Sequence, residues 1–359
     1  MLQRARRAAG PSMRAWQSDD RSRATAIWLG LVAAVIVAMV VVGGATRVTG
    51  SGLSITQWKP VSGVIPPLTH ADWERMFSLY RATPQYRLIN AGMSLAEFRS
   101  IFWWEWGHRL LGRLLGLVFF VPFVALVALK RLPRRLIWPC VILFVLGAAQ
   151  GGVGWWMVKS GLEQRTSVAP ERLATHLGLA LLLLAAIIWT ALEAWFGPGR
   201  TGRHGRNGWV WASGLFLAAV YGQCLLGALV AGNHAGLVDA DWPLMAGRLV
   251  PSDYWRGSLW ATLAHGAAAV QFNHRLGAYG LLIAGAAMAV APFRRDADAL
   301  RPLVLIIGGL LLVQVGLGVS ALLLTVPLPL AMAHQFTAVT LLTLAAALAW
   351  RARRLEQVL

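Results

Sequence analysis

Four histidines of this 359-residue chain stand where long apolar segments begin: His108, His176, His274 and His334. Imidazole is a nitrogen donor that can remain neutral, so it can ligate a metal in an apolar environment without adding charge. Two imidazoles that face each other across a helical bundle can hold a flat iron macrocycle between them, one on each axial side. The spacing therefore predicts two such sites, one for each successive pair of histidines.

A simpler interpretation of these histidines is that they cap helix ends or hydrogen-bond to one another. Their matching positions in two halves of the chain favour ligation over this alternative. A tetrahedral metal site is not predicted, because no carboxylate or thiolate completes a ligand set. Cys140 and Cys224 lie inside apolar segments without a CxxC partner, and are predicted to be buried thiols.

Arginines accompany two of the histidines. Arg109 and Arg275 directly follow them and can pair with heme propionates through charge-assisted hydrogen bonds. Arg113 lies one turn deeper than Arg109, and Tyr279 holds the matching position in the second half, so Arg113 is a candidate for a role peculiar to the first half. Arg47, at the end of the first apolar segment, is either another propionate partner or an interfacial charge.

One acidic residue distinguishes the two halves. Glu105 stands three residues before His108, whereas Gln271 holds the matching position before His274. On a helix, this spacing places the carboxyl group on the same face as the histidine. An ionisable group beside an apolar pocket is costly and is a functional candidate, which suggests proton-dependent chemistry at one site and electron storage or transfer at the other. The alternative is an interfacial ion pair between Glu105 and Arg109, one turn further on.

The elements that position these residues are membrane spans. Hydrophobic residues make up 57% of the chain and charged residues 13%, about half the charged fraction of an ordinary soluble domain. Apolar runs of about 20 residues can cross a hydrocarbon layer about 30 Å thick, and backbone groups in lipid require helices. The predicted fold is an all-α polytopic membrane protein with eight transmembrane helices. The predicted spans are 27–46, 108–129, 137–157, 173–195, 209–231, 274–292, 303–324 and 332–350.

Basic residues gather at the two termini and in the connections after the second, fourth and sixth spans. By the positive-inside rule, both termini are predicted to be cytoplasmic and the four histidines to lie toward the opposite face. This pattern accounts for the net charge of +18 without nucleic acid, whose binding needs a basic surface stripe. The first span is too long for a cleaved signal core and is predicted to be a signal anchor. The basic residues concerned are Arg4, Arg6, Arg7, Arg14, Arg21, Arg23, Lys130, Arg131, Arg134, Arg135, Arg200, Arg203, Arg206, Arg294, Arg295, Arg301, Arg351, Arg353 and Arg354.

The chain also contains an internal repeat. Trp58-Lys59-Pro60 in the first long outer connection is matched by Trp242-Pro243 in the second, and a Gln-x-x-x-Gly pattern recurs at three span ends, beginning at Gln150, Gln223 and Gln314. Four spans followed by four more in the same orientation predict two pseudo-symmetric four-helix bundles, related by an axis along the membrane normal. The predicted divisions are a basic cytoplasmic N-terminal tail (1–26), an N-terminal four-helix half (27–196), a basic cytoplasmic linker (197–208), a C-terminal four-helix half (209–351) and a cytoplasmic C-terminal tail (352–359).

Together, these motifs resemble the heme A synthase family, in the type whose first outer loop lacks cysteines. The resemblance covers about residues 25–350. It rests on Glu-Trp-Gly-His-Arg-x-x-Gly-Arg at 105–113, the loop GATRVTGSGLS at 44–54, the Trp58-Lys59-Pro60 turn and Asn273-His274-Arg275. Some members carry a cysteine pair in the first outer loop, but residues 48–107 contain none, so a thiol relay into the site is not predicted.

The resemblance implies a reaction and a set of site residues. The C8 methyl group of heme O would be hydroxylated twice, and the product would lose water to leave the formyl group of heme A, which is needed for cytochrome oxidase assembly. A resident heme b would occupy the second half and the substrate heme the first half. The implied catalytic residues are Glu105, His108 and His176, and the two histidines would bind the substrate iron. His274, His334 and Arg275 would bind heme b, with the two histidines as ligands of its iron. The candidates for binding the substrate propionates are Arg109, Arg113 and Arg47.

The resemblance also implies partners and a location. The partners are heme O, the heme O synthase that supplies it, an electron donor that the sequence does not identify, and membrane lipid. A bacterial inner membrane, with the heme sites toward the periplasm, is favoured over a mitochondrial inner membrane by the short basic tail.

The residues alone leave two other functions open: a di-heme b-type cytochrome that transfers electrons from a quinol, and a heme carrier or assembly factor. The cytochrome would not need Glu105, and the carrier would bind its cofactor without redox turnover. Of the remaining histidines, His70, His204 and His234 are predicted to be solvated in loops, and His265 to be structural or to line a heme edge.

Overall fold

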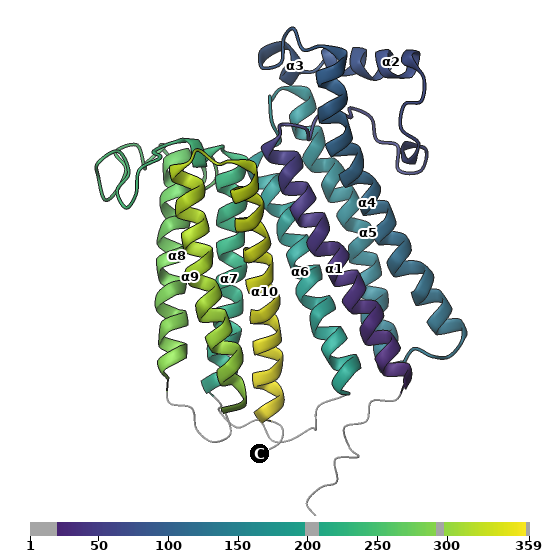
Figure 1. Cartoon of the computed structure of the whole chain (residues 1–359), viewed down its shortest axis with the longest axis vertical. Helices are drawn as coiled ribbons and strands as arrows, with labels where there is room; N and C mark the ends of the chain where they lie inside the picture. Colours follow the sequence, from purple (N-terminus) through teal and green to yellow (C-terminus); the bar gives the residue numbers. More distant parts are fainter. Residues whose placement is uncertain (1–19, 198–207, 292–297, 357–359) are drawn as a thin grey trace, which may run out of the picture.

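The computed structural model describes residues 20–197, 208–291 and 298–356, and within these ranges the chain is helical with no β-strand. Eight long helices dominate the described chain, and two short helices cross one end (Figure 1). The long helices are α1 (Asp20–Val48), α4 (Leu95–Ala128), α5 (Arg134–Glu163), α6 (Pro170–Phe196), α7 (Gly208–Gly232), α8 (Ala267–Val290), α9 (Arg301–Leu323) and α10 (Leu328–Glu356). The short ones are α2 (His70–Arg81) and α3 (Pro84–Leu88).

Seven of the long helices are long and apolar enough to cross a membrane, which confirms the prediction of an α-helical polytopic membrane protein. The helix outside this set is α8, whose first half carries Gln271, Asn273, His274 and Arg275. These polar residues lower its mean hydropathy. The assignment of α8 as the sixth of eight spans therefore stays a prediction.

The basic segments on which the predicted orientation rests are only partly described. Figure 1 shows α1 beginning and α10 ending at the same end of the molecule, opposite α2 and α3. Nine of the arginines in that prediction, and His204, lie outside the described residues: Arg4, Arg6, Arg7, Arg14, Arg200, Arg203, Arg206, Arg294 and Arg295.

Helix α4 begins earlier than the predicted span. A capping box starts it: the Ser94 hydroxyl accepts a hydrogen bond from the Glu97 backbone N–H, and the Glu97 carboxylate accepts one from the Ser94 backbone N–H. Such a cap satisfies the free backbone donors of the first turn and fixes the start of the helix. His108 therefore lies well inside α4, with Glu105 in the same continuous helix.

The early part of α4 forms an aromatic cluster with α2. Trp73, Phe77 and Tyr80 from α2 are buried against Phe98 and Phe102 from α4. Figure 1 shows α2 and α3 beside this end of α4, outside the main group of helices. The cluster buries apolar surface that would otherwise face water, and so it anchors the first outer loop onto α4.

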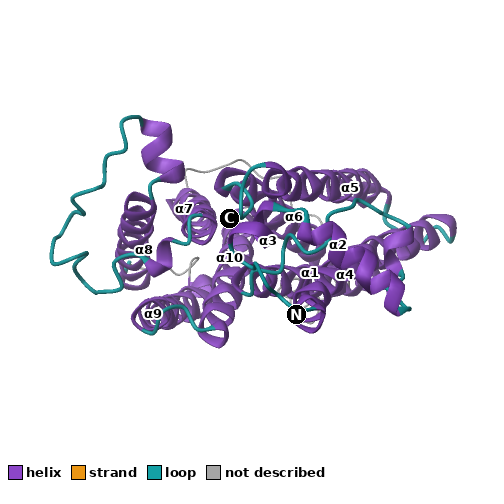
Figure 2. Ribbon diagram, turned by 90° about the horizontal axis from the view of Figure 1, so that it is seen from above, coloured by secondary structure: helices purple, strands orange, loops and turns teal. Residues whose placement is uncertain are grey.

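The long helices pack as two rings of four. In the first, α1 contacts α4 and α6, and α5 contacts the same two helices; in the second, α7 contacts α8 and α10, and α9 contacts the same two. The rings meet where α6 packs on α7 and α10, and where α1 packs on α10. Figure 2 shows the two groups side by side from above, with the connection before α8 extending beyond the helices. One apolar core cluster includes residues from both rings.

Candidate functional site

Each of the four predicted ligand histidines packs against a glycine of the long helix that precedes it. A Cβ atom on that glycine would lie between 2.9 and 3.2 Å from the imidazole, closer than a side chain can ordinarily approach. The pairs are Gly43 with His108, Gly154 with His176, Gly227 with His274, and Gly318 with His334. Glycine therefore makes room for the ring at four equivalent helix contacts.

Three of these glycines belong to the Gln-x-x-x-Gly pattern, and their glutamines bind the histidine segments. Gln150 Nε2 donates to the carbonyl oxygen of His176 at 2.7 Å, and Gln223 Nε2 donates to that of His274 at 2.8 Å. Gln314 Nε2 lies 3.3 Å from the Nε2 atom of His334. The side-chain oxygens of all three glutamines are buried without a hydrogen-bond partner in the described part of the chain.

His274 and His334 face each other in the second ring, with their ring centres 6.4 Å apart and their planes inclined at 76°. Two imidazoles that bind one metal through bonds of about 2 Å have ring centres about 6 Å apart, so this separation leaves room for a single ion. His334 Nδ1 lies 3.1 Å from the carbonyl oxygen of Gln314, to which it can only donate. That tautomer leaves a lone pair on Nε2, the atom type that binds metals, and in this structure the lone pair faces the side-chain nitrogen of Gln314 at 3.3 Å.

The donor set of this pair suits an axial pair of heme ligands. Among the described residues, no group of three or more His, Cys, Asp or Glu side chains is placed to hold a metal ion. Two neutral imidazole nitrogens suit the iron of a porphyrin, because the porphyrin itself supplies the other four ligands. The ring separation and the unpartnered glutamine oxygens are compatible with a heme at this position.

His108 and His176 lie in the first ring, on α4 and α6, and are close enough to interact electrostatically. No hydrogen-bond partner reaches His176 Nδ1 within the described residues, although the atom is buried. In place of a glutamine, α1 carries Met39 one turn before Gly43, and Met39 contacts Gly112 of α4. The first pair is therefore held by fewer polar contacts than the second.

Glu105 is 2% exposed and binds the first outer loop. Its Oε2 atom accepts hydrogen bonds from the Ser54 hydroxyl at 2.7 Å and the Ile55 backbone N–H at 2.8 Å. Its Oε1 atom accepts two from Arg109, the shorter at 2.6 Å, and Arg109 in turn donates to the carbonyl oxygens of Ile55 and Gln57. The ion pair considered from the sequence is thus present, as part of a buried clamp on the loop.

Gln271 and Arg275 form the matching clamp in the second half. Gln271 is 3% exposed, and its Nε2 atom donates to two loop carbonyls, at 2.8 and 2.6 Å, while its Oε1 atom accepts from Arg275 at 3.1 Å. Arg275 also donates to two further loop carbonyls, at 2.9 and 3.0 Å. The four loop carbonyls belong to Ala235, Val238, Leu244 and Asp239.

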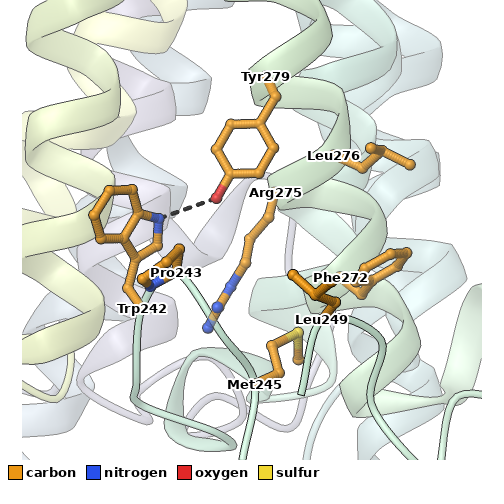
Figure 3. A pocket seen from close by; sticks show the side chains of 8 residues that line it. All are labelled: Trp242, Pro243, Met245, Leu249, Phe272, Arg275, Leu276 and Tyr279. Atoms are coloured by element: carbon orange, nitrogen blue, oxygen red, sulfur yellow. Dashed lines mark hydrogen bonds between the residues drawn. The ribbon is translucent and has the colours of Figure 1, made fainter. Parts of the chain in front are cut away.

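The other predicted propionate partners also bind backbone oxygens. Arg113 donates to the carbonyl oxygens of Lys59 and Pro60 at 2.9 and 2.8 Å, and Tyr279 at the matching position accepts from Trp242 Nε1 at 3.1 Å (Figure 3). Each side chain therefore joins its helix to the outer-loop turn that the sequence repeat identified.

Arg47 joins the two halves. It donates to the carbonyl oxygen of Ala231 at 2.7 Å, and its NH2 atom lies 2.7 Å from His234 Nε2. Burial, and to a lesser extent the nearby guanidinium, lower the pKa of His234. The neutral imidazole can accept a hydrogen bond from Arg47, so His234 contacts Arg47 while its side chain remains exposed to solvent, as predicted.

Two other histidines lie in the outer loops. His265 approaches Glu171 at 3.7 Å and packs against Trp260, which matches its predicted structural role. His70 lies 3.9 Å from Glu74 on the surface.

Comparisons with known proteins identify the family to which this chain belongs. The family model described as cytochrome oxidase assembly protein matches residues 26–346. The heme A synthase of Caulobacter sp. (strain K31) is 54% identical over 345 residues, covering 95% of this chain and 100% of the relative. The chain belongs to the heme A synthase family. The heme A synthases of Caulobacter vibrioides and Maricaulis maris are 52% and 47% identical, over 95% and 94% of this chain and 100% and 99% of theirs.

Membership of the heme A synthase family confirms the resemblance drawn from the motifs. The structure brings His274 and His334 together as predicted, and places Glu105 one turn from His108. Gly43 is a contact that the sequence reasoning missed. The Gln-x-x-x-Gly pattern did not reveal Gly43, because Met39 stands four residues before it where the other three glycines have a glutamine.

Proposed function

We propose that this chain oxidises heme O to heme A, with His108, His176 and Glu105 at the substrate site and with a heme b held by His274 and His334. The observation that carries the proposal is the duplicated histidine-on-glycine arrangement, of which one copy alone has a carboxylate beside it. Relatives named heme A synthase, about half identical along nearly the whole chain, supply the reaction.

We further propose that the two rings are pseudo-symmetric four-helix bundles with eight spans, divided as the sequence repeat predicts. The packing order supports this, since α1, α4, α5 and α6 contact one another as α7, α8, α9 and α10 do. The interface between the rings follows the same correspondence. Helix α6 contacts α7, and their counterparts in the repeat, α10 and α1, also contact each other. On this scheme α8 is a span because it corresponds to α4.

The resident site is the one between His274 and His334. A heme bound there would supply one-electron redox chemistry close to the outer loops. The protein's own contribution is to fix the ligand geometry. Gln223 binds the His274 segment, the Gln314 carbonyl oxygen selects the His334 tautomer, and the paired glycines keep each ring against its neighbouring helix.

The substrate site is the one between His108 and His176. Glu105 and Arg109 hold the loop at 54–57 against α4, beside the proposed substrate site. A carboxylate one turn from a ligand histidine can take up or release a proton beside the reacting methyl group. Arg109, Arg113 and Arg47 are the candidates for the propionates, and Arg275 is the candidate in the resident half.

The location and partners follow the same scheme. We place the protein in the bacterial inner membrane with both termini in the cytoplasm and the two heme sites toward the periplasm. Heme O arrives from the synthase that makes it, and its apolar tail favours entry from the lipid.

Identification of the extracted hemes tests the proposal. Membranes from cells with a heme O source are expected to contain heme A when wild-type protein is present. With Glu105→Gln, heme A is expected to fall at least about 100-fold while heme b is retained, because losing a positioned proton-transfer group typically costs about 10²–10⁴-fold in rate. Wild-type membranes with heme b and heme O but no heme A would instead indicate an electron-transfer cytochrome or a heme carrier.

A further inference from the structure

The second outer loop exposes a group of large apolar side chains. Within residues 249–260, which we call the projecting segment, five of the twelve residues are large, apolar and exposed. They are Leu249, Val250, Trp255, Leu259 and Trp260. Leu249 is 81% exposed. Single exposed apolar residues are ordinary on a protein surface, but a concentration of them in one short segment indicates a surface that contacts something other than water.

Hydrogen bonds fix the backbone on both sides of the first residues of the projecting segment. Before it, the carboxylate of Asp241 accepts hydrogen bonds from the backbone N–H groups of Ala246 and Gly247, at 3.1 and 3.2 Å. Within it, the Tyr254 hydroxyl donates to Asn273 Oδ1 of α8 at 3.2 Å. The exposure of the apolar side chains is therefore a property of a loop that is attached to itself and to α8.

The projecting segment belongs to a connection that lies beside the long helices rather than above them. Figure 1 shows the connection between α7 and α8 reaching sideways at the level of the outer ends of α8 and α9, and Figure 2 shows it extending outside the ring. Helix α9 is apolar enough to cross a membrane, and Leu323 and Leu324 are exposed at its outer end. The surroundings of a membrane protein at this level are the headgroups and the adjoining acyl chains of the lipid.

The exposed apolar surface continues from the projecting segment onto α8. Leu249 and Leu276 line the same cavity of about 290 Å³ (Figure 3). Leu276 and Ile283 are both exposed and are seven residues apart on α8, which places them on one face, roughly two helical turns from each other. The same apolar surface therefore covers the loop and the outward face of the helix, which is the arrangement expected for contact with lipid.

We propose that the projecting segment inserts into the bilayer leaflet nearest to the outer loops, and that it lies in the plane of the headgroups. Leu249, Val250 and Leu259 would contact the first part of the acyl chains. Trp255 and Trp260 would lie at the boundary between chains and headgroups, where tryptophan is enriched in membrane proteins. Deeper insertion is excluded, because an irregular backbone in the hydrocarbon layer would leave its N–H and carbonyl groups without partners.

The charges of the projecting segment agree with apolar rather than electrostatic attachment. It carries one acid, Asp253, and one base, Arg256, so its net charge is zero (one positive minus one negative). Both side chains are exposed and can stay among the headgroups while their apolar neighbours are buried in lipid. Binding at an interface grows with the apolar area buried and with attraction to anionic lipid. The first of these contributions is the one that this segment supplies, so insertion is expected in neutral phosphatidylcholine.

Spin labels on single cysteines test the insertion, with the full-length protein in phosphatidylcholine liposomes. In a background with Cys140→Ala and Cys224→Ala, the labelled positions are Leu249→Cys and Leu259→Cys. Arg75→Cys, on the exposed surface of α2, is the control in water, and Ile283→Cys is the control in lipid. The collision rate of each label is measured with oxygen, which concentrates among acyl chains, and with a water-soluble nickel chelate. The ratio of oxygen to nickel collisions is expected to be at least about fivefold higher at the two loop positions than at Arg75→Cys, and below that at Ile283→Cys.

A second measurement uses the wild-type chain and needs no substitution. A phosphatidylcholine with a diazirine near the carboxyl end of one acyl chain is expected to label peptides that contain residues 249–260. Residues 70–81 of α2 are expected to stay unlabelled, since Figure 1 shows this helix beyond the ends of the long helices.

Three results would overturn the inference. Collision ratios at Leu249→Cys and Leu259→Cys equal to that at Arg75→Cys would place the projecting segment in water. Few collisions with either reagent, together with spin–spin broadening, would show that a second copy of the chain covers it. Lipid labelling that omits residues 249–260 in the wild-type protein would show that no acyl chain reaches the segment. Heme A formation does not enter these measurements, so their outcome is independent of the proposed reaction.

Discussion

The two outer-loop clamps use the same helix positions with opposite hydrogen-bonding polarity. In the first half the loop offers donors, a hydroxyl and a backbone N–H, and Glu105 accepts both. In the second half the loop offers two carbonyl oxygens, and Gln271 donates to both. In each half an arginine four residues on completes the clamp. A carboxylate fits the first loop and an amide fits the second, so local structure alone gives a reason for the acid in one half.

This comparison changes how the acid is understood. From the sequence, Glu105 was either a catalytic group or the partner of Arg109. The structure shows the ion pair, with the carboxylate also holding the loop above the first ring. Glu105 can therefore act by moving protons or by positioning that loop, and variants of the two clamps distinguish the two roles.

The largest expected effect concerns the histidine pairs. His274→Ala or His334→Ala is expected to abolish the b-type heme spectrum of the purified protein, because one imidazole cannot supply both axial bonds. His108→Ala or His176→Ala is expected to leave that spectrum largely intact and to abolish heme A formation. Absorption spectra and extracted pigments measure the two outcomes. Equal loss of spectrum from both pairs would contradict the assignment of resident and substrate sites.

The sequence predicted most of the fold, because apolar length is a direct signal. Each predicted span falls within one long helix, apart from the last one or two residues of three of them. The start of α4 was not predicted, because the capping box at Ser94 lies in a polar stretch that hydropathy does not mark. The pairing of His274 with His334 was predicted from the repeated positions of the four histidines. The hydrogen-bonding polarity of the two loops was not predicted. The groups that bind Glu105 and Gln271 are mostly backbone N–H and carbonyl groups, which almost every residue carries, so the residue types do not reveal which of them faces the helix.

An intermediate effect is expected when the clamp residues are changed. In Gln271→Glu, a carboxylate faces the carbonyl oxygens of Ala235 and Val238, and leaving these groups without donors costs about 1–3 kcal/mol. A lower Tm and reduced heme b content are expected, with both measured on purified protein. Gln271→Met, which removes the donor without adding charge, is expected to fall between this variant and the wild type. An unchanged Tm in Gln271→Glu would contradict the polarity argument.

The first clamp separates positioning from catalysis. Ser54→Ala removes one donor to Glu105 and leaves the carboxylate in place, at a cost of about 1 kcal/mol. If Glu105 handles protons, heme A formation in Ser54→Ala is expected to stay within about threefold of wild type, whereas Glu105→Gln loses it. If Ser54→Ala and Glu105→Gln lose heme A equally at similar Tm, the carboxylate acts by holding the loop. Heme A yield per retained heme b is the quantity to compare.

The smallest expected effect is at the contact between the halves, where Arg47 meets His234. Because the pKa of His234 is lowered in the folded protein, the unfolded chain binds this proton more readily. Stability from this group is therefore present above the ordinary histidine pKa and decreases as the pH falls below it. His234 is exposed, so the expected change in Tm between pH 8 and pH 5 is small, about 1 °C. His234→Gln is expected to remove this part of the pH dependence. Identical Tm profiles for the variant and the wild type would show that protonation of His234 does not weaken the contact.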